Sequence, residues 1–284
     1  MMLGVDLHTH SNISDGTLSP EQLVHAAHEK GIHTLALTDH DTMDGLALAA
    51  QIANGYDMKL ISGVEISSQW SRPATKKSYS VHIVALNMQH PEPLLAVLQQ
   101  QKQIRAERAE QICRLLTPLI GQDIYADVLS KVDGEADRIT RTHIAKTLVE
   151  KGIVSRVQQA FDKYIKEGKK AYVKFDGLGL EETIQVIHAS GGFAVLAHPT
   201  RYDLSATNVR YLIELFAQAG GDAVELPPQI DPPATRQMVD RMIAEQGLKV
   251  SVGSDFHGEN MPWIQLGRVP VMKAGQVGIW EQFQ

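Results

Sequence analysis

Short apolar runs alternate with amphipathic helical segments at both ends of this chain, and this pattern limits the fold more than any other feature. The first run, LGVDLH, precedes the helical segment SPEQLVHAAHEKG, in which Ser19 is a candidate N-cap and Pro20 takes the first helical position. The runs HTLALTDH, KLISGVEIS and YSVHIVALN predict further strands. The alternation returns in the last third of the chain and ends with KVSVGSDFH. Strands separated by helices predict a parallel sheet of the α/β class.

The segment from Pro91 to Lys170 interrupts this alternation with helices. The stretch EPLLAVLQQQKQIRAERAEQICRLLTPLI is long and amphipathic, and ITRTHIAKTLVEKG and RVQQAFDKYIKEG follow it. We therefore predict a discontinuous α/β domain, residues 1–90 and 171–284, with an inserted helical domain, residues 91–170.

Composition narrows the class of protein. The chain has 284 residues, is 43% hydrophobic and carries one cysteine, Cys113, which excludes an internal disulfide and suits a reducing cytoplasm. No apolar run is long enough for a membrane span, and we see neither a signal peptide nor a sign of a protein partner. The net charge of −6 argues against a basic nucleic-acid-binding surface. Residues 91–170, however, hold 14 Lys/Arg and 11 Asp/Glu, a net charge of +3 that can meet an anionic substrate.

Residue types that bind metals stand at the ends of the apolar runs. They are His8, His10, Asp39, His40, Asp41, Glu65, His82, His198, Asp255 and His257. The C-terminal ends of the strands converge on one face in α/β barrels, so we expect these side chains to meet there. Side chains at i and i+2 share a face of a strand, so His8 and His10 can hold one ion together. Imidazoles and carboxylates without thiolates suit zinc, manganese or iron.

Each of these residues also has a simpler interpretation. A His-x-His pair occurs by chance on surface strands, His82 fits a buried core histidine, and Asp39 or Asp41 fits a helix cap. The recurrence of the same residue types at successive strand ends favours a multinuclear metal site. Such a site activates water and neutralises phosphate charge, so the pattern indicates metal-assisted hydrolysis.

The motifs DLHTHSNISDG, LTDHDT, GVEIS, HIVAL, LAHPTRY and GSDFH together resemble the PHP (polymerase and histidinol phosphatase) phosphoesterases over nearly the whole chain. The resemblance implies a distorted (β/α)7 barrel with an inserted helical domain and with up to three metal ions at one face. It implies three ligand sets, which are His8, His10, Glu65 and Asp255, then Asp15, His40 and His257, and then Glu65, His82 and His198. Glu65 would bridge two ions.

A narrower resemblance, to the ribonuclease AM branch with its 3',5'-nucleotide bisphosphate phosphatases, comes from QQQKQIRAERAEQI, TRTHIAKTLVEKG, YIKEGKKAYV and PWIQLGR. It implies a manganese-preferring 5'-3' exoribonuclease that matures ribosomal RNA 5' ends and dephosphorylates nucleotide 3',5'-bisphosphates, with the insertion as a lid. Two stretches depart from the branch. SSQWSRPATKKSYS is longer than expected and VELPPQIDPP is rich in proline, so substrate choice can differ even where the metal chemistry is shared.

The resemblance leads to a mechanistic hypothesis. A metal-bound water held by Glu65, Asp255 and His257 attacks phosphorus in line, and Arg141 or Arg201 stabilises the developing charge. The candidates for substrate binding are Arg141, His143, Lys170, Arg201 and Ser11, each of which also fits an ordinary helix or loop residue. The aromatic residues Tyr202, Phe256 and Trp263 are candidates for stacking on bases, although Phe256 also fits the core.

Two alternatives remain open at this stage. The first is a small-molecule phosphatase of the histidinol-phosphate or sugar-phosphate type on the same barrel, against which the basic insertion argues. The second is a non-catalytic binding module that keeps metals for structure, against which the complete set of nine ligand positions argues. The residue types accept manganese, zinc or iron, so manganese is favoured by the resemblance alone.

Overall fold

The computed structural model describes residues 4–72, 77–259 and 264–283. The chain forms two compact units, which we call the barrel unit (Met1–Val97 with Leu178–Gln284) and the helical unit (Leu98–Gly177). Both boundaries lie a few residues beyond those expected from the sequence. The long helix α3 (Glu92–Ile120) begins in the barrel unit and continues into the helical unit.

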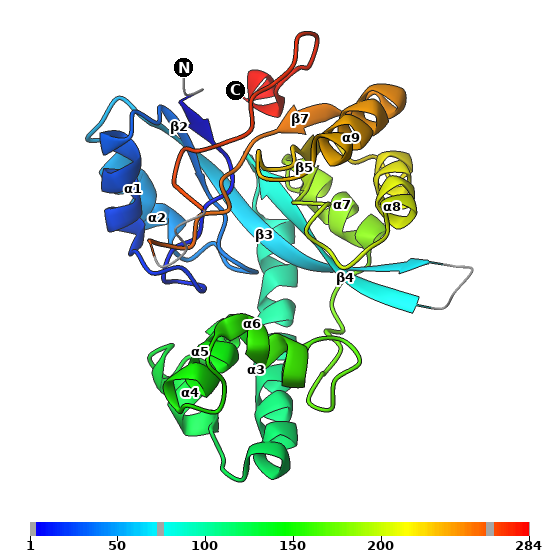
Figure 1. The fold of residues 1–284 in the computed structure, drawn as a ribbon. Coiled ribbons are helices and arrows are strands. Elements are labelled where there is room, and N and C mark those ends of the chain that lie inside the picture. The colour runs from blue at the N-terminus through cyan, green and yellow to red at the C-terminus, as the bar shows by residue number, and fades with distance from the viewer. Residues whose placement is uncertain (1–3, 73–76, 260–263, 284) are drawn as a thin grey trace. The chain divides into compact units, whose positions relative to one another are not determined.

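The barrel unit is built on a sheet whose strands follow chain order (Figure 1). Within the described residues the strands are β1 (Val5–Asp6), β2 (Thr34–Leu37), β3 (Lys59–Arg72), β4 (Lys77–Leu86), β5 (Phe193–Leu196), β6 (Ala223–Glu225) and β7 (Lys249–Ser251). Beyond β1 and β7 the chain continues to pair, because Leu7 N donates to Val252 O (3.0 Å) and Asp255 N donates to His8 O (2.9 Å). These bonds curl the sheet into a distorted barrel, so the predicted fold class is confirmed.

The prediction of a wholly parallel sheet is wrong at one strand. β4 runs antiparallel to both β3 and β5, while the other neighbouring pairs are parallel. Only residues 73–76 separate β3 from β4, and a parallel crossover needs about a dozen residues or more. Much of the stretch SSQWSRPATKKSYS is therefore paired strand, in which the rings of Trp70 and Tyr79 stack at 5.1 Å, and residues 73–76 lie outside the described part.

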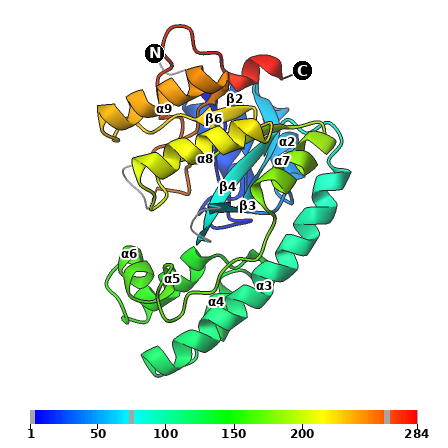
Figure 2. The ribbon, with the colours of Figure 1, turned by 90° about the vertical axis from the view of Figure 1, so that its right-hand side faces the viewer.

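Helices flank the sheet of the barrel unit (Figures 1 and 2). They are α1 (Pro20–Glu29), α2 (Leu46–Ala53), α7 (Leu180–Ala189), α8 (Ala206–Gln218) and α9 (Pro233–Gln246). The first begins where the sequence predicts it, since Ser19 Oγ accepts from Gln22 N (3.1 Å) in a capping box. Its apolar face, with Leu23 and Val24, packs on Leu35 and Leu37 of β2. A 3₁₀ turn, Ile279–Gln282, follows near the end of the chain.

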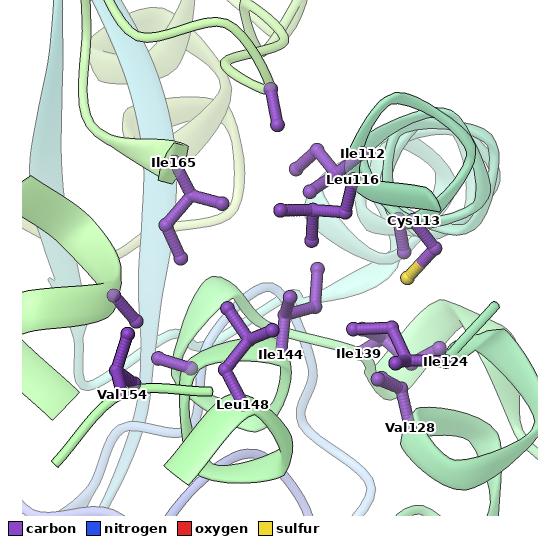
Figure 3. Packing of buried hydrophobic residues seen from close by; sticks show 14 of the residues in the cluster. Ile112, Cys113, Leu116, Ile124, Val128, Ile139, Ile144, Leu148, Val154 and Ile165 are labelled. Carbon is purple, nitrogen blue, oxygen red and sulfur yellow. The ribbon is translucent and has the colours of Figure 1, made fainter. Parts of the chain in front are cut away.

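The helical unit has a hydrophobic core of its own (Figure 3). Its elements after α3 are α4 (Tyr125–Ser130), a 3₁₀ turn (Ala136–Arg138), α5 (Arg141–Glu150), α6 (Val157–Ala160) and a π-helical turn (Phe161–Ile165). Ile112, Leu116, Ile144 and Leu148 are buried together in this core. The sequence did not predict α4, because six residues are too few for a helical period to stand out. No helix among the described residues has the length and apolar character needed to span a membrane.

Candidate metal centre

The residues and the loop that directly follow β1 form the first part of the site. His8 and His10 are both buried and point to the same side, while Thr9 between them donates through Oγ1 to Ala36 O (2.6 Å) on the neighbouring strand. The chain then turns toward Asp15, and Gly16 lies so close to the start of the turn that a Cβ there would be 2.5 Å from the carbonyl oxygen of His10. A glycine is therefore required at this position.

His8, His10, Glu65 and Asp255 bring four buried ligand atoms together. The Nε2 atoms of His8 and His10 are 3.1 Å apart and lie 3.3 and 3.2 Å from Glu65 Oε2. Asp255 Oδ1 lies 3.5 Å from the first of these nitrogens and 3.3 Å from the second. Ligands at about 2.1 Å around a tetrahedral ion are about 3.4 Å from one another. The four atoms thus have the spacing of a divalent-cation site.

A second group shares His10 with the first and adds Asp15, His40 and His257. Asp15 Oδ1 lies 3.3 Å from His257 Nε2 and 3.8 Å from His40 Nε2. The rings of His10 and His257 stack, with centroids 4.0 Å apart. These residues come from the ends of three strands and from the loop after β1, so only the folded sheet brings them into one group.

Glu65 joins these groups to a third one. Its Oε1 lies 2.7 Å from His82 Nδ1 and 2.8 Å from His198 Nε2, and its Oε2 lies 3.0 Å from His40 Nδ1. Glu65, His82 and His40 form a further group with the spacing of metal ligands. The resemblance pairs His82 with His198 instead, and the division of the nine residues among ions stays a prediction.

The charges of the cluster favour a bound cation. Burial by itself would raise the pKa of Glu65, but His82 and His40 outweigh burial and hold that pKa well below its usual range. Burial would lower the pKa of His10, but Asp255 and Glu65 raise it to about 10. Three imidazole nitrogens lie 3.0–3.3 Å from the buried Glu65 Oε2, but among the described residues none satisfies it with good hydrogen-bond geometry, which is costly for a carboxylate. A divalent ion would satisfy this oxygen and replace the proton that the imidazoles attract.

Glu225 supports the centre and was missed from the sequence. It lies at the end of β6 and is buried, and His8 Nδ1 donates to its Oε2 at 2.6 Å. Because Nδ1 carries the proton in this bond, Nε2 of His8 keeps a lone pair that faces Glu65 and Asp255. Carboxylates commonly orient metal-binding histidines in this way. The place of Glu225 at a strand end, like that of the other ligands, is the signal that could have found it.

Asp39 and Asp6 order the loops that carry the ligands. Asp39 accepts from Ser11 N (2.8 Å), Ser11 Oγ (2.6 Å) and Ser14 Oγ (2.6 Å), and so shapes the loop before Asp15. Asp6 accepts from the backbone N–H groups of Ser254 and Gly267, both at 2.9 Å. Burial raises the pKa of Asp6 to about 6, although these hydrogen bonds oppose the rise.

The predicted substrate-binding residues fall in different places. Arg201 donates through Nη1 to Asp255 Oδ2 and so lies beside the ligand cluster. Ser11 is buried, with its hydroxyl bonded to Asp39. The other three belong to the helical unit, where Arg141 lies over the ring of Phe161 and His143 Nδ1 accepts from Thr140 N (3.1 Å) in a capping box, while Lys170 is exposed. Their contact with substrate stays a prediction.

The aromatic candidates divide in the same way. Tyr202 accepts from His82 N (2.7 Å) and donates to Ala197 O (3.0 Å), so its hydroxyl holds the backbone next to two predicted ligands. Phe256 is buried in the core with Leu35 and Leu37. Trp263 lies outside the described residues.

Comparison with known proteins places the chain in a family. The family model described as the PHP domain matches residues 6–244. The chain belongs to the PHP family. The ligand positions that the resemblance implies lie within that match, except Asp255 and His257, which follow it.

Relatives of this PHP chain match it over most of its length. The "5'-3' exoribonuclease" of Haemophilus influenzae is 40% identical over 98% of both chains. The "3',5'-nucleoside bisphosphate phosphatase" of Chromobacterium violaceum is 36% identical over 90% of this chain and 88% of its own. A solved structure of an amidohydrolase from C. violaceum, with bound sulfate and no metal, matches with a TM-score of 0.88 at 33% identity over 98% of this chain and 95% of its own. This PHP chain is a phosphoester hydrolase, as the names of its relatives predict.

Proposed function

We propose that the protein hydrolyses the phosphate ester at the 3' side of a 5'-phosphorylated nucleotide, both in RNA and in free nucleoside 3',5'-bisphosphates. The observation that carries the proposal is the buried cluster of histidines and carboxylates around Glu65, whose atoms have the spacing of metal ligands. The names of the full-length relatives supply the two substrate classes. Working on RNA, the enzyme would act in the cytoplasm, where its buried thiol Cys113 stays reduced.

One reaction accounts for both substrates. Each carries a phosphate on the 3' oxygen of a nucleotide that also has a 5' phosphate. Water attacks this phosphorus, the bond from phosphorus to O3' breaks, and O3' leaves as a hydroxyl after taking a proton. The products are a nucleoside 5'-monophosphate and either inorganic phosphate or an RNA shortened by one nucleotide with a new 5' phosphate. The shortened RNA is again a substrate.

The residues of the barrel unit have separate tasks in this reaction. His8, His10, Glu65 and Asp255 would hold one divalent ion, and the groups around Asp15 and His82 would hold up to two more, with manganese favoured. Bound ions lower the pKa of water and neutralise phosphate charge. Arg201, beside Asp255, can donate from its remaining N–H groups to a phosphate oxygen. Glu225 keeps the Nε2 lone pair of His8 directed at the site.

We further propose that the helical unit binds the 5' phosphate through Arg141, with His143 and Lys170 of the same unit as further candidates. Positive charges crowd inside this unit. Burial, together with the charges of Arg141 and Arg105, lowers the pKa of Arg108 to about 9. A phosphate bound by these guanidinium groups would relieve their repulsion and accept paired hydrogen bonds.

The test is turnover of adenosine 3',5'-bisphosphate and of a 5'-phosphorylated oligoribonucleotide with added manganese. We expect inorganic phosphate from the first and successive nucleoside 5'-monophosphates from the second, at a rate that falls at least about a thousandfold in Asp255→Ala. A 5'-hydroxyl oligonucleotide and histidinol phosphate are the control substrates and should be poor ones. Failure to cleave either main substrate, with metal content verified, would refute the proposal.

A further inference from the structure

The barrel unit contains a cavity of about 310 Å³ whose lining, apart from Arg201, has no role in the proposed reaction. Its lining includes Arg201, Pro228, Gln229, Ile230, Ser254 and Arg268. It adjoins the metal centre, because Ser254 precedes Asp255 in the chain and Arg201 donates to Asp255 Oδ2. On the basis of the proposed function, we infer that this cavity binds the RNA on the 3' side of the cleaved bond, beginning with the nucleotide whose 5' oxygen is esterified to the attacked phosphate.

Two arginines make the cavity attractive to a phosphodiester backbone. The guanidinium of Arg268 is exposed and forms no ion pair or hydrogen bond with any residue that the structure describes. Arg201 uses Nη1 for Asp255, and a guanidinium has further N–H groups to offer. None of the lining residues that the structure describes is acidic. Arginines placed in this way hold phosphate oxygens without reading the sequence of the RNA.

The proline-rich stretch VELPPQIDPP forms an apolar side of the same cavity. Ile230 is 82% exposed, the highest value among the large hydrophobic residues that the structure describes. Its loop is held in place because Asp231 N donates to Pro228 O (3.0 Å) and Thr200 Oγ1 donates to Asp231 Oδ2 (2.7 Å). An exposed apolar side chain on a loop held in this way, beside two arginines, offers a surface against which the face of a base can pack.

The volume limits what the cavity can hold. At about 310 Å³ it lies at the lower end of the range for small-molecule sites, which suits a single nucleotide and excludes a folded RNA. A free nucleoside 3',5'-bisphosphate ends at its 3' phosphate and has no group that reaches beyond it. Only a polynucleotide continues past the attacked phosphorus, so the cavity would act on RNA cleavage and not on bisphosphate hydrolysis.

The experiment compares Arg268→Ala with the wild-type holoenzyme on both substrates. We expect the KM for a 5'-phosphorylated oligoribonucleotide to rise roughly fivefold and the slope of log KM against log salt to fall by about 0.7, as one phosphate contact is lost. The kinetics for adenosine 3',5'-bisphosphate should stay unchanged. Ile230→Ser should also raise the oligonucleotide KM alone. The matched control is Arg241→Ala, which removes an exposed arginine of α9 that does not line the cavity.

The outcomes separate this inference from the proposed function. Equal effects of Arg268→Ala on both substrates, or no effect on either, would overturn the assignment of the cavity while hydrolysis itself stands. Turnover of the bisphosphate with no cleavage of RNA would also overturn it. If the wild-type protein cleaves neither substrate, the proposed function fails and the inference fails with it. Melting curves of each variant verify that the fold is intact.

Discussion

At the scale of single residues, the centre depends on contacts between side chains that are far apart in the sequence. Glu65 contacts histidines from four separate segments of the chain through its two oxygens. Glu225 contacts only one predicted ligand, His8, but it decides which nitrogen of that ring faces the other ligands. A residue of the second kind orients a ligand, so its loss should weaken metal binding without removing a ligand atom.

Glu225→Leu should therefore lower metal affinity about 10- to 100-fold, and Glu225→Gln, which keeps a hydrogen-bond acceptor, should lower it less. Manganese and zinc titration of the metal-free protein, by calorimetry or with a competing chelator dye, measures the change directly. Glu245→Gln on the exposed side of α9 is the control. Wild-type affinity in both Glu225 variants would show that His8 needs no orienting partner.

At the scale of elements, side chains of α9 form hydrogen bonds and an ion pair with the segment of the chain that follows β7. Asp240 accepts from Arg236 Nε (2.8 Å) and from Gln276 Nε2 (2.8 Å), and its other oxygen pairs with Lys273 Nζ (2.6 Å). Arg236 also donates to Val271 O (2.9 Å). One carboxylate thus joins a helix to a segment that has no regular structure of its own.

Asp240→Asn should lower the free energy of unfolding by about 1 kcal/mol at neutral pH. Burial would raise the pKa of Asp240, but hydrogen bonds from Lys273, Arg236 and Gln276 hold it below its usual value. A carboxyl whose pKa is lower in the folded state adds stability above its unfolded pKa of about 3.9, and this stability is lost as pH falls through the folded value. Urea denaturation at pH 7 and below pH 3 should therefore show the two proteins converging in acid. A constant difference between them would contradict this account.

At the scale of the whole molecule, the hydrophobic cores of the two units and the metal centre each contribute to the stability of the fold. The helical unit buries its own apolar side chains, and the metal ligands lie in the barrel unit. A metal ion that binds only the folded chain should therefore stabilise the barrel unit.

Removal of metal with EDTA should lower the melting temperature, and metal at 100 times its dissociation constant should add about 2.7 kcal/mol. Leu148→Ala, in the core of the helical unit, should cost about 2–5 kcal/mol and yet leave metal affinity unchanged. Calorimetric scans with and without metal measure both effects. Identical melting curves in EDTA and in manganese would contradict a role for metal in the stability of the barrel unit.

The sequence alone predicted most elements, and the nine ligand positions that the family resemblance implies stay a prediction, although eight of them lie in groups with the spacing of metal ligands. The helix after Ser19, the strands before His8 and His198, and the long helix α3 follow from local periodicity and capping, which depend on neighbours within a few residues. The PHP family and its phosphoesterase class followed from the same strand-end motifs. The antiparallel direction of β4 was missed, although the shortness of residues 73–76 carried the signal.

Only the tertiary structure decided how these parts meet. In the folded chain, His8 donates a hydrogen bond to Glu225, the hydroxyl of Ser11 donates to Asp39, and Arg201 donates to Asp255. The tertiary structure also placed the proline-rich loop beside Arg268 at one cavity. The physical reason is that the position of a strand end depends on residues close in sequence. The hydrogen-bond partners and distances between side chains depend on the curled sheet, which brings distant segments within a few ångströms of one another.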